Sequence, residues 1–356
     1  MKIITIVGAR PQFIKAAAVS REIEKYKDIQ EIIVHTGQHF DANMSEIFFE
    51  EMHIPKPHYN LNINGLSHGA MTGQMIEKIE EVLMIEKPDW VLVYGDTNST
   101  IAGALAARKL HIKVAHVEAG LRSFNMTMPE EINRILTDRI SNILFCPTNA
   151  AINNLKAEGY ENIDIQIVKS GDVMQDAALF YEEKAKAPDL FLPKEFVLAT
   201  IHRAENTDDK SRLENIFEAF SEIGKTMPVI LPLHPRTKKI IESSSFNINE
   251  DRVQIINPIG YLEMVFLLKR AKLIMTDSGG LQKEAFFFKK PCITLRDETE
   301  WVELVENGFN TVVGARKDKI IQSFENQRYD IDFSMDLYGK GKASEFIIEK
   351  LINFVE

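Results

Sequence analysis

The sequence predicts a two-domain α/β protein in which each domain is built on a doubly wound, mainly parallel sheet. Short runs rich in β-branched residues alternate with amphipathic stretches from the first residues onward, and the alternation starts again in the second half of the chain. The runs are continuously apolar, which is typical of parallel strands covered by helices on both faces. A chain of 356 residues also exceeds what one hydrophobic core usually organises.

In the first half, apolar runs predict strands, and stretches with helical spacing predict the helices between them. In the last of these helices Ile132, Leu136 and Ile140 fall on one face, and Pro129 suits the first turn of a helix. The expected strands are residues 3–7, 31–36, 90–94, 113–117 and 143–146, and the expected helices are residues 13–26, 67–85, 100–109 and 129–141.

The second half repeats the pattern, and Gly171 and Asp172, which follow a last short strand, place the junction near residues 167–171. We therefore expect one domain at residues 1–168 and another at 169–340. The remaining segment, 341–356, carries a helix with no strand after it, which must pack on what is already built. The expected strands of the second domain are residues 196–200, 228–234, 253–256, 273–276 and 291–295, with helices at 213–223 and 261–269.

Composition excludes several classes of function. The formal net charge of -10 argues against a nucleic-acid partner or a basic membrane patch. Cys146 and Cys292 are far apart, which excludes a disulfide framework and a cysteine-rich zinc site and suits a reducing compartment. No apolar run approaches about 20 residues, and Gly8 and Pro11 interrupt the start too early for a signal peptide. We expect a cytoplasmic protein with no membrane partner.

Unusual polar residues follow the carboxyl ends of the expected strands, where open parallel sheets bind ligands. Any single one of them can be an ordinary solvated loop residue, but their shared position at the strand ends favours a functional role. Two such edges that face each other would form an interdomain cleft. The residues in question are Arg10, Gln38, His39, Asp96, Glu118, His202, Arg203, His234, Arg236 and Asp277.

The segment from Ser278 to Glu284 is the most specific local pattern. Ser278 can cap a helix, Gly279 and Gly280 let a diphosphate approach the first amides, and Glu284 one turn later suits the two hydroxyls of a ribose. The alternative is an ordinary capped helix with a glycine-rich entry. The turn that begins at Gly8 matches neither GxGxxG nor a P-loop, which weakens the case for NAD binding or ATP hydrolysis.

Asp96, Glu118 and Glu130 can form a carboxylate cluster around one sugar ring. Crowded carboxylates raise one another's pKa, which would leave one as an acid and another as a base. The alternative for Glu130 and its neighbour Glu131 is that acids in a first turn complement the helix dipole. His202 is either a core histidine or, beside Arg203, a group that neutralises phosphate. No spacing of ligands suggests a metal site.

Taken together, these segments resemble the non-hydrolysing UDP-N-acetylglucosamine 2-epimerases. The matching motifs run in the family's order from Gly8 to Glu300 and cover most of the chain. Each one is weak by itself, but the ordered set is specific. The motifs are GARPQFIK, TGQH, VYGDTNST, HVEAGLRS, PEEINR, HRAEN, HPR, TDSGGLQKEA and RDETE.

The resemblance implies two Rossmann-like domains of the glycosyltransferase-B type, with the active site in the interdomain cleft and the last helix packed back on the N-terminal domain. It also implies a homodimer, and, in bacterial members, activation by the UDP-sugar. By motif, Asp96, Glu118 and Glu130 are the acid/base carboxylates, and His202 lies near the phosphates. Arg10 and Lys15 correspond to residues that bind diphosphate or sugar, and Ser278, Gly279, Gly280 and Glu284 correspond to the UDP-binding helix.

The implied reaction inverts C2 of a UDP-N-acetylhexosamine. The C2 hydrogen has no neighbouring carbonyl to acidify it, so direct deprotonation is implausible. Loss of UDP from C1 permits elimination across C1–C2, and UDP then adds back to the 2-acetamidoglucal with protonation from the other face. This reaction needs acid/base groups on both faces of the sugar and positively charged groups that bind the diphosphate. It needs no cofactor or metal.

Two segments depart from the pattern of the enzymes that act on UDP-GlcNAc. Those enzymes commonly read RDTTERPE where this chain reads RDETEWVE, so that Trp301 replaces an arginine. Residues 123–128, SFNMTM, replace a stretch that contains Tyr-Ser-Pro. Both segments resemble the branch of the family that acts on UDP-2,3-diacetamido-2,3-dideoxyglucuronate. This sugar nucleotide is therefore the alternative substrate.

Three rival functions remain. A glycosyltransferase of the same fold would use the same nucleotide helix but would need an acceptor groove. A hydrolysing epimerase would release free sugar and UDP. A non-catalytic nucleotide-sugar sensor would tolerate loss of Asp96 and Glu118.

Overall fold

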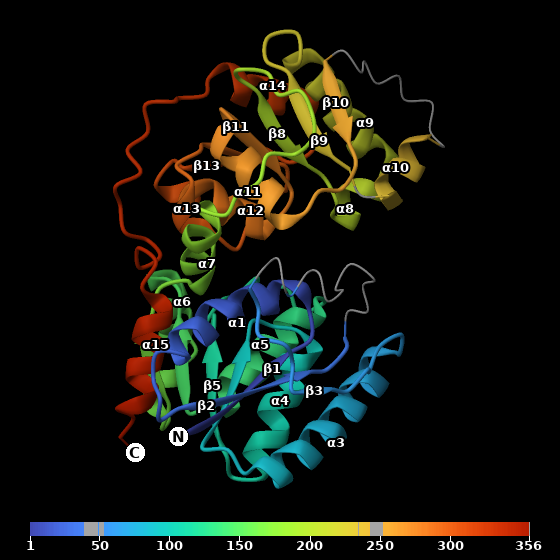
Figure 1. Ribbon diagram of the computed structural model, residues 1–356. Coiled ribbons are helices and arrows are strands. Elements are labelled where there is room, and N and C mark those ends of the chain that lie inside the picture. The colour runs from blue at the N-terminus through green and yellow to red at the C-terminus, as the bar shows by residue number, and fades with distance from the viewer. Residues whose placement is uncertain (39–48, 50–52, 234, 243–251, 356) are drawn as a thin grey trace. The chain divides into compact units, whose positions relative to one another are not determined.

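The computed structural model describes residues 1–38, 49, 53–233, 235–242 and 252–355 (Figure 1). The chain divides into two compact units, Met1–Ala177 with Asp336–Glu356, and Ala178–Met335. The first division thus falls within helix α7 (Val173–Glu182), whereas the sequence suggested residues 168/169. The chain returns to the first unit at residue 336 and not at the expected 341. In the described part of the chain, no helix is both long and apolar enough to cross a membrane.

The first unit is a parallel sheet with helices between its strands. Its strand order, β3-β2-β1-β4-β5-β6-β7, runs outward from β1 in one direction and then from β4 in the other. Its strands are β1 (Lys2–Val7), β2 (Gln30–His35), β3 (Tyr59–Asn60), β4 (Trp90–Tyr94), β5 (Lys113–Val117), β6 (Ile143–Cys146) and β7 (Gln166–Lys169). Its helices are α1 (Arg10–Ile23), α3 (His68–Glu86), α4 (Asn98–Lys109), α5 (Pro129–Ile140), α6 (Asn149–Ala157), the start of α7, and α15 (Ala343–Ile352), with a 3₁₀ turn at Tyr160–Asn162.

The second unit has the same winding, with strand order β10-β9-β8-β11-β12-β13 and all described pairs parallel. Its strands are β8 (Val197–Thr200), β9 (Val229–Pro232), β10 (Val253–Ile256), β11 (Leu273–Thr276), β12 (Cys292–Thr294) and β13 (Asn310–Val312). Its helices are α8 (Ala204–Thr207), α9 (Lys210–Ile223), α10 (Pro235–Glu242), α11 (Tyr261–Arg270), α12 (Gly279–Phe287), α13 (Val302–Glu306) and α14 (Lys317–Glu325). The expected doubly wound α/β class is confirmed for both units.

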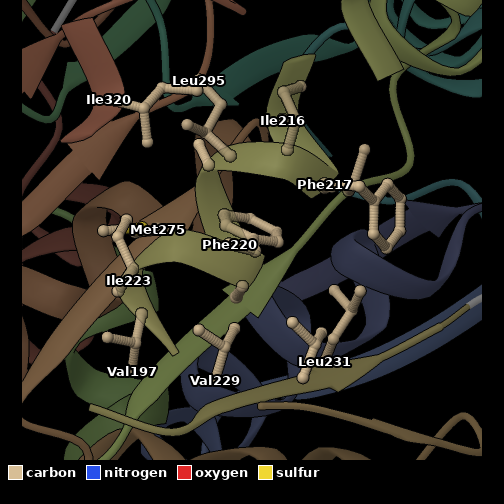
Figure 2. Packing of buried hydrophobic residues seen from close by; sticks show 14 of the residues in the cluster. Val197, Ile216, Phe217, Phe220, Ile223, Val229, Leu231, Met275, Leu295 and Ile320 are labelled. Carbon is tan, nitrogen blue, oxygen red and sulfur yellow. The ribbon is translucent and has the colours of Figure 1, made fainter. Parts of the chain in front are cut away.

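Each unit has its own apolar core between sheet and helices. In the second unit, Phe217, Phe220 and Ile223 of α9 pack on Val197 of β8 and Val229 of β9 (Figure 2). These α9 residues recur at helical spacing, whereas the strand residues come from the centre of the sheet. The first unit buries the corresponding face of α3 and α4 against β1, β2, β4 and β5.

Most predicted elements are found with ends shifted by a few residues. The first helix begins at Arg10 and not at residue 13, because Pro11 is accommodated in the first turn, where no backbone donor is needed. The strand expected at 228–234 ends at Pro232. β3 and β13 were not predicted, since runs of two or three residues are too short to carry a period.

The returning segment 336–341 packs directly against Gly171, which has a φ of +84°. The Asp172 amide donates to the Tyr338 carbonyl at 2.8 Å. A Cβ at residue 171 would come 2.5 Å from that same carbonyl oxygen. Beyond it, Asp176 accepts hydrogen bonds from the amides of Ala343 and Ser344, which begin α15.

Gly171→Ala should therefore destabilise the first unit. The positive φ alone costs an alanine roughly 1–2 kcal/mol, and the clash with backbone at Tyr338 adds to it. Gly69→Ala is the matched control, because a Cβ added at Gly69 would have no atom within 4 Å and the φ there is not positive. The urea midpoint should fall for Gly171→Ala and stay within error or rise for Gly69→Ala. Equal midpoints would show that the returning segment adds no constraint at Gly171.

Candidate functional site

In the first unit, the strand order reverses between β1 and β4, and ligands of doubly wound sheets bind at the carboxyl ends of such strands. Arg10 follows β1 as the first residue of α1, Asp96 follows β4 and Glu118 follows β5. All three side chains are partly exposed. Glu118 has a φ of +71°, an uncommon conformation for a residue with a side chain. This edge gathers the residues that the sequence singled out.

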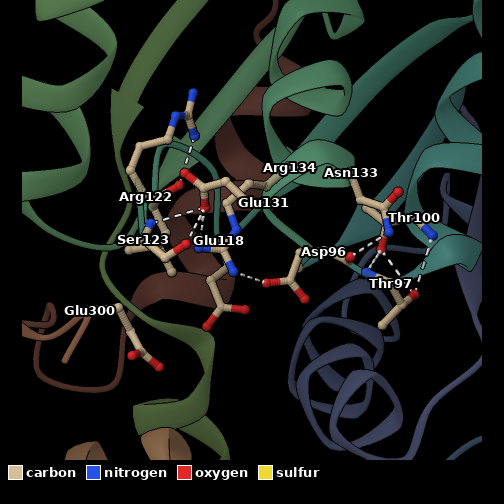
Figure 3. A network of polar contacts seen from close by, with 12 residues as sticks. Asp96, Thr97, Thr100, Glu118, Arg122, Ser123, Glu131, Asn133, Arg134 and Glu300 are labelled. Atoms are coloured by element: carbon tan, nitrogen blue, oxygen red, sulfur yellow. Dashed lines mark hydrogen bonds and ion pairs between the residues drawn. The ribbon is translucent and has the colours of Figure 1, made fainter. Parts of the chain in front are cut away.

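Two basic side chains each form an ion pair with one of the two carboxylates. Lys15 of α1 forms an ion pair with Glu118, and only 12% and 9% of the two side chains is exposed. Arg134 of α5 forms an ion pair with Asp96, of which 32% is exposed (Figure 3). Burial raises the pKa of Asp96 above its ordinary value, Arg134 and Lys15 lower it, and the charge of Glu118 raises it. Asp96 therefore holds a proton more readily than an isolated aspartate, as a general acid must.

The two glutamates at the start of α5 have different surroundings. Glu130 is exposed, whereas Glu131 is 1% exposed. Glu131 accepts hydrogen bonds from the backbone and hydroxyl of Ser123 and from the Phe124 amide, at 2.9–3.0 Å, and pairs with Arg134 (Figure 3). Glu131 thus fixes the start of the 123–128 loop, while Glu130 does not belong to this buried network.

The glycine turn after β1 is filled by protein atoms. A Cβ at Gly8 would come within 2.2 Å of the Thr36 and Ser99 hydroxyls. The Gln12 side chain accepts from the Gly8 and Ala9 amides and donates to the Tyr94 carbonyl and the Thr100 hydroxyl. This turn has a packing reason for its glycine, in agreement with its departure from nucleotide-binding loops.

In the second unit, the strand order reverses between β8 and β11, and α12 begins directly after β11. The Ser278 hydroxyl caps this helix by accepting from the Leu281 amide. A Cβ at Gly279 would lie 2.4 Å from Glu300 Oε1, so Gly279 is needed for packing. Gly280 is exposed, and the nearest atom to a Cβ there is 4.0 Å away. The open approach to the helix start is at Gly280.

Glu284, one turn into α12, is held by a tyrosine that the sequence did not single out. The Tyr261 hydroxyl donates to Glu284 Oε1 at 2.7 Å. Burial raises the pKa of Tyr261 well above its ordinary value, and the charge of Glu284 adds to the effect, so the phenol stays protonated. Glu284 is 5% exposed. One of its oxygens is therefore oriented by Tyr261.

Asp277, fully buried at the end of β11, holds the turn after β8. It accepts hydrogen bonds from the amides of His202 and Arg203 and from the Asn206 side chain. His202 Nδ1 lies 3.3 Å from Asp277 Oδ1, and half of the His202 side chain is exposed. A carboxylate behind an imidazole fixes the orientation of the ring, and the exposed part of the ring can face a ligand.

Trp301 packs behind the start of α12. It is 4% exposed, and Lys283 Nζ lies 4.1 Å from the centre of its ring. Trp301, which stands where the resemblance places an arginine, is thus part of the packing that supports the start of α12. By contrast, Phe124 and Met126 of the 123–128 loop are 75% and 59% exposed.

Several residues missed by sequence reasoning are partners of those it found. Arg134 lies on the side of α5 away from Ile132 and Leu136, where helical spacing predicts exposure, and no local pattern distinguishes Tyr261 from the other residues of its helix. His39 and His234 lie outside the described residues, as does the side chain of Arg236.

Comparisons with known proteins agree with this geometry. The family described as UDP-N-acetylglucosamine 2-epimerase matches residues 21–352. UDP-2,3-diacetamido-2,3-dideoxy-D-glucuronate 2-epimerase of Pseudomonas aeruginosa is 60% identical over 99% of both chains. The crystal structure of Methanocaldococcus jannaschii UDP-GlcNAc 2-epimerase in complex with UDP-GlcNAc and UDP is 46% identical with a TM-score of 0.86, over 99% of both chains.

A third relative is more distant in sequence. The structure of the Neisseria meningitidis UDP-GlcNAc 2-epimerase bound to UDP-GlcNAc is 34% identical, covers 99% of this chain and 100% of its own, and has a TM-score of 0.87. These likenesses confirm the predicted fold class, two Rossmann-like domains of the glycosyltransferase-B type. A family match over nearly the whole chain, with relatives of this identity, leads to one conclusion: the chain belongs to the UDP-N-acetylglucosamine 2-epimerase family and is an isomerase.

Proposed function

We propose that this enzyme inverts C2 of a UDP-N-acetylhexosamine by eliminating UDP and adding it back, and that Asp96 and Glu118 carry the proton transfers. The observation that supports this most directly is the pairing of Asp96 with Arg134 and of Glu118 with Lys15 at one edge of the first sheet. Two carboxylates with separate cationic partners can hold different protonation states, as a base and an acid must.

In the first half of the reaction, a base removes the C2 proton while the C1–O bond breaks. The electron pair of the C–H bond forms the C1=C2 double bond, and that of the C1–O bond leaves with the β-phosphate. In the second half, an acid protonates C2 from the opposite face and UDP attacks C1. Glu130, exposed at the start of α5, remains a candidate for the third carboxylate.

UDP would be held by residues of the second unit. Ser278 and Gly280 at the start of α12 suit the diphosphate, Glu284 suits the ribose, and His202 backed by Asp277 suits a phosphate. Arg10 and Lys15 would add positive charge on the sugar side. Charge on the leaving diphosphate grows in the transition state, so these cations stabilise it more than they stabilise the substrate.

The substrate favoured among the two candidates is UDP-2,3-diacetamido-2,3-dideoxyglucuronate, because the relative named for that sugar is 60% identical over 99% of both chains. The 123–128 loop supports the choice, since exposed Phe124 and Met126 offer apolar surface for a second acetamido methyl group. UDP-GlcNAc itself is the alternative.

We also propose that the enzyme is a homodimer, as the family resemblance implies, and that it is cytoplasmic. Both cysteines, Cys146 and Cys292, are buried free thiols, in keeping with a reducing compartment. Sedimentation analysis of the purified chain tests the dimer.

Turnover in deuterated water tests the proposal. Elimination replaces the C2 proton from a solvent-exchangeable group, so product should carry deuterium at C2, and traces of the glucal should appear on long incubation. The measurement is run with both sugars, and kcat/KM should be higher for the diacetamido uronate.

The rival functions give different results in the same experiment. A glycosyltransferase leaves C2 undeuterated and requires an acceptor, a hydrolysing epimerase accumulates free sugar and UDP in equal amounts, and a sensor turns nothing over. Higher kcat/KM for UDP-GlcNAc would select the alternative substrate without changing the reaction class.

Asp96→Asn and Glu118→Gln should each lower kcat by about 10²–10⁴-fold, the usual effect of removing a positioned acid or base. The affinity for UDP, measured by calorimetry, should stay within a few-fold, because UDP is assigned to α12 and the β8 turn. Glu77→Gln removes an exposed carboxylate from the same unit and serves as the control. Near-normal kcat in both variants would sink the assignment.

Glu284→Ala and Ser278→Ala should instead weaken binding of UDP. A lost hydrogen bond to a charged group is worth roughly 1.5–3 kcal/mol, which corresponds to about tenfold to over a hundredfold in Kd. Tyr261→Phe should give a smaller loss than Glu284→Ala, since it only frees the carboxylate. Glu325→Ala, an exposed glutamate of the same unit, is the control. An unchanged Kd for Glu284→Ala and Ser278→Ala would refute the role of α12.

A further inference from the structure

His116 lies inside β5, fully buried, with both ring nitrogens close to oxygen atoms. Its Nδ1 is 2.7 Å from Asp138 Oδ1, and its Nε2 is 2.7 Å from the Gly95 carbonyl oxygen. A fully buried histidine needs a hydrogen-bond partner for each of its two ring nitrogens. Here it is satisfied at both.

The partners fix where the protons are. A carbonyl oxygen only accepts, so Nε2 must carry hydrogen and donate to Gly95. Nδ1 faces a carboxylate oxygen, and a proton must lie between the two, because two lone pairs at this distance would repel. The other oxygen of Asp138 accepts from Arg122 Nη1 at 2.7 Å and from the Gly120 amide at 3.2 Å.

This network is closed by Glu158, which pairs with Arg122 through two hydrogen bonds of 2.7 and 2.8 Å. None of the side chains of His116, Arg122 and Asp138 is exposed. Removing one member of a buried charged network leaves its partners unsatisfied, so the members hold one another in a single arrangement.

The network ends on the two turns that carry the reactive carboxylates. Gly95, whose carbonyl accepts from His116, directly precedes Asp96 and has a φ of +63°. Gly120, whose amide donates to Asp138, has a φ of +78° and follows Glu118 at +71°. The Gly95 amide also donates to Val117, which joins the two turns. Glycine adopts a positive φ without strain, whereas the positive φ of Glu118 is uncommon and persists only where the surroundings hold it.

We propose that His116 is a positioning residue: through its Nε2 hydrogen bond it sets the Gly95–Asp96 peptide, and so the place of the Asp96 carboxylate relative to Glu118. It does not touch the substrate. The inference rests on the proposed roles of Asp96 and Glu118. A displacement of about 1 Å in a reacting group can cost about 10²-fold in rate, so the effect belongs in kcat.

Two amide substitutions separate the two hydrogen bonds of the ring. The amide nitrogen of Gln reaches about as far along the side chain as His Nε2, and that of Asn about as far as Nδ1. H116Q should keep the bond to Gly95 and lose the one to Asp138, whereas H116N should keep Asp138 and lose Gly95. The positioning role requires that H116N lose kcat by about tenfold to a hundredfold, and that H116Q retain several times more.

Each kcat is normalised to enzyme that binds UDP in a calorimetric titration, and melting temperatures are recorded beside it. KM and the Kd of UDP should be unchanged in both variants. Equal kcat values in H116Q and H116N, or losses that follow only the melting temperatures, overturn the proposal. Failure of the unmodified enzyme to deuterate C2 defeats the proposed function instead, before any variant is made.

A measurement on the unmodified protein covers the case in which the variants do not fold. In ¹⁵N-histidine spectra, one ring should show an Nε2-bound hydrogen that exchanges with solvent over hours, since His116 is fully buried with that hydrogen bonded. Absence of any slowly exchanging Nε2 hydrogen overturns the proposal.

Discussion

The strand order reverses where β1 pairs with β4, and again where β8 pairs with β11. At each reversal, the helices that follow the two strands go to opposite faces of the sheet. The backbone therefore leaves an opening at the carboxyl edge that no crossover covers. Asp96 in the first unit and the start of α12 in the second both lie at this place. The polar residues of each unit can be partly exposed there without breaking a core.

Charge balance is the second condition that the first unit must meet. Two carboxylates close enough for one to raise the pKa of the other would drive each other to protonate, unless cations are placed between them. Lys15 and Arg134 come from two different helices, α1 and α5, and each forms an ion pair with one carboxylate. Beneath them, His116 and Asp138 form hydrogen bonds with the backbone of both turns, at Gly95 and Gly120. The two carboxylates thus lie above a buried layer of hydrogen-bonded side chains.

In the second unit, the same winding serves a different purpose. The cap at Ser278, the exposed Gly280 and the Tyr261–Glu284 pair all concern one helix start, where backbone amides and the helix dipole favour an anion. Trp301 and Glu300 support that start from behind, by packing against Lys283 and Gly279. A substitution in this supporting layer can move the start of α12 without altering the residues proposed to hold UDP.

The sequence by itself determined the fold class, the strands other than β3 and β13, and the residues at their carboxyl ends, because continuous apolar runs and helical spacing are local properties of the chain. It also determined the family, through an ordered set of motifs. Only the tertiary structure decided which charges are neighbours. The partners Arg134 for Asp96, Tyr261 for Glu284 and His116 for the Gly95 carbonyl are separated from them by 38, 23 and 21 positions in the chain. No local pattern encodes such contacts, since they depend on how helices and strands pack, and this packing also separates exposed Glu130 from buried Glu131.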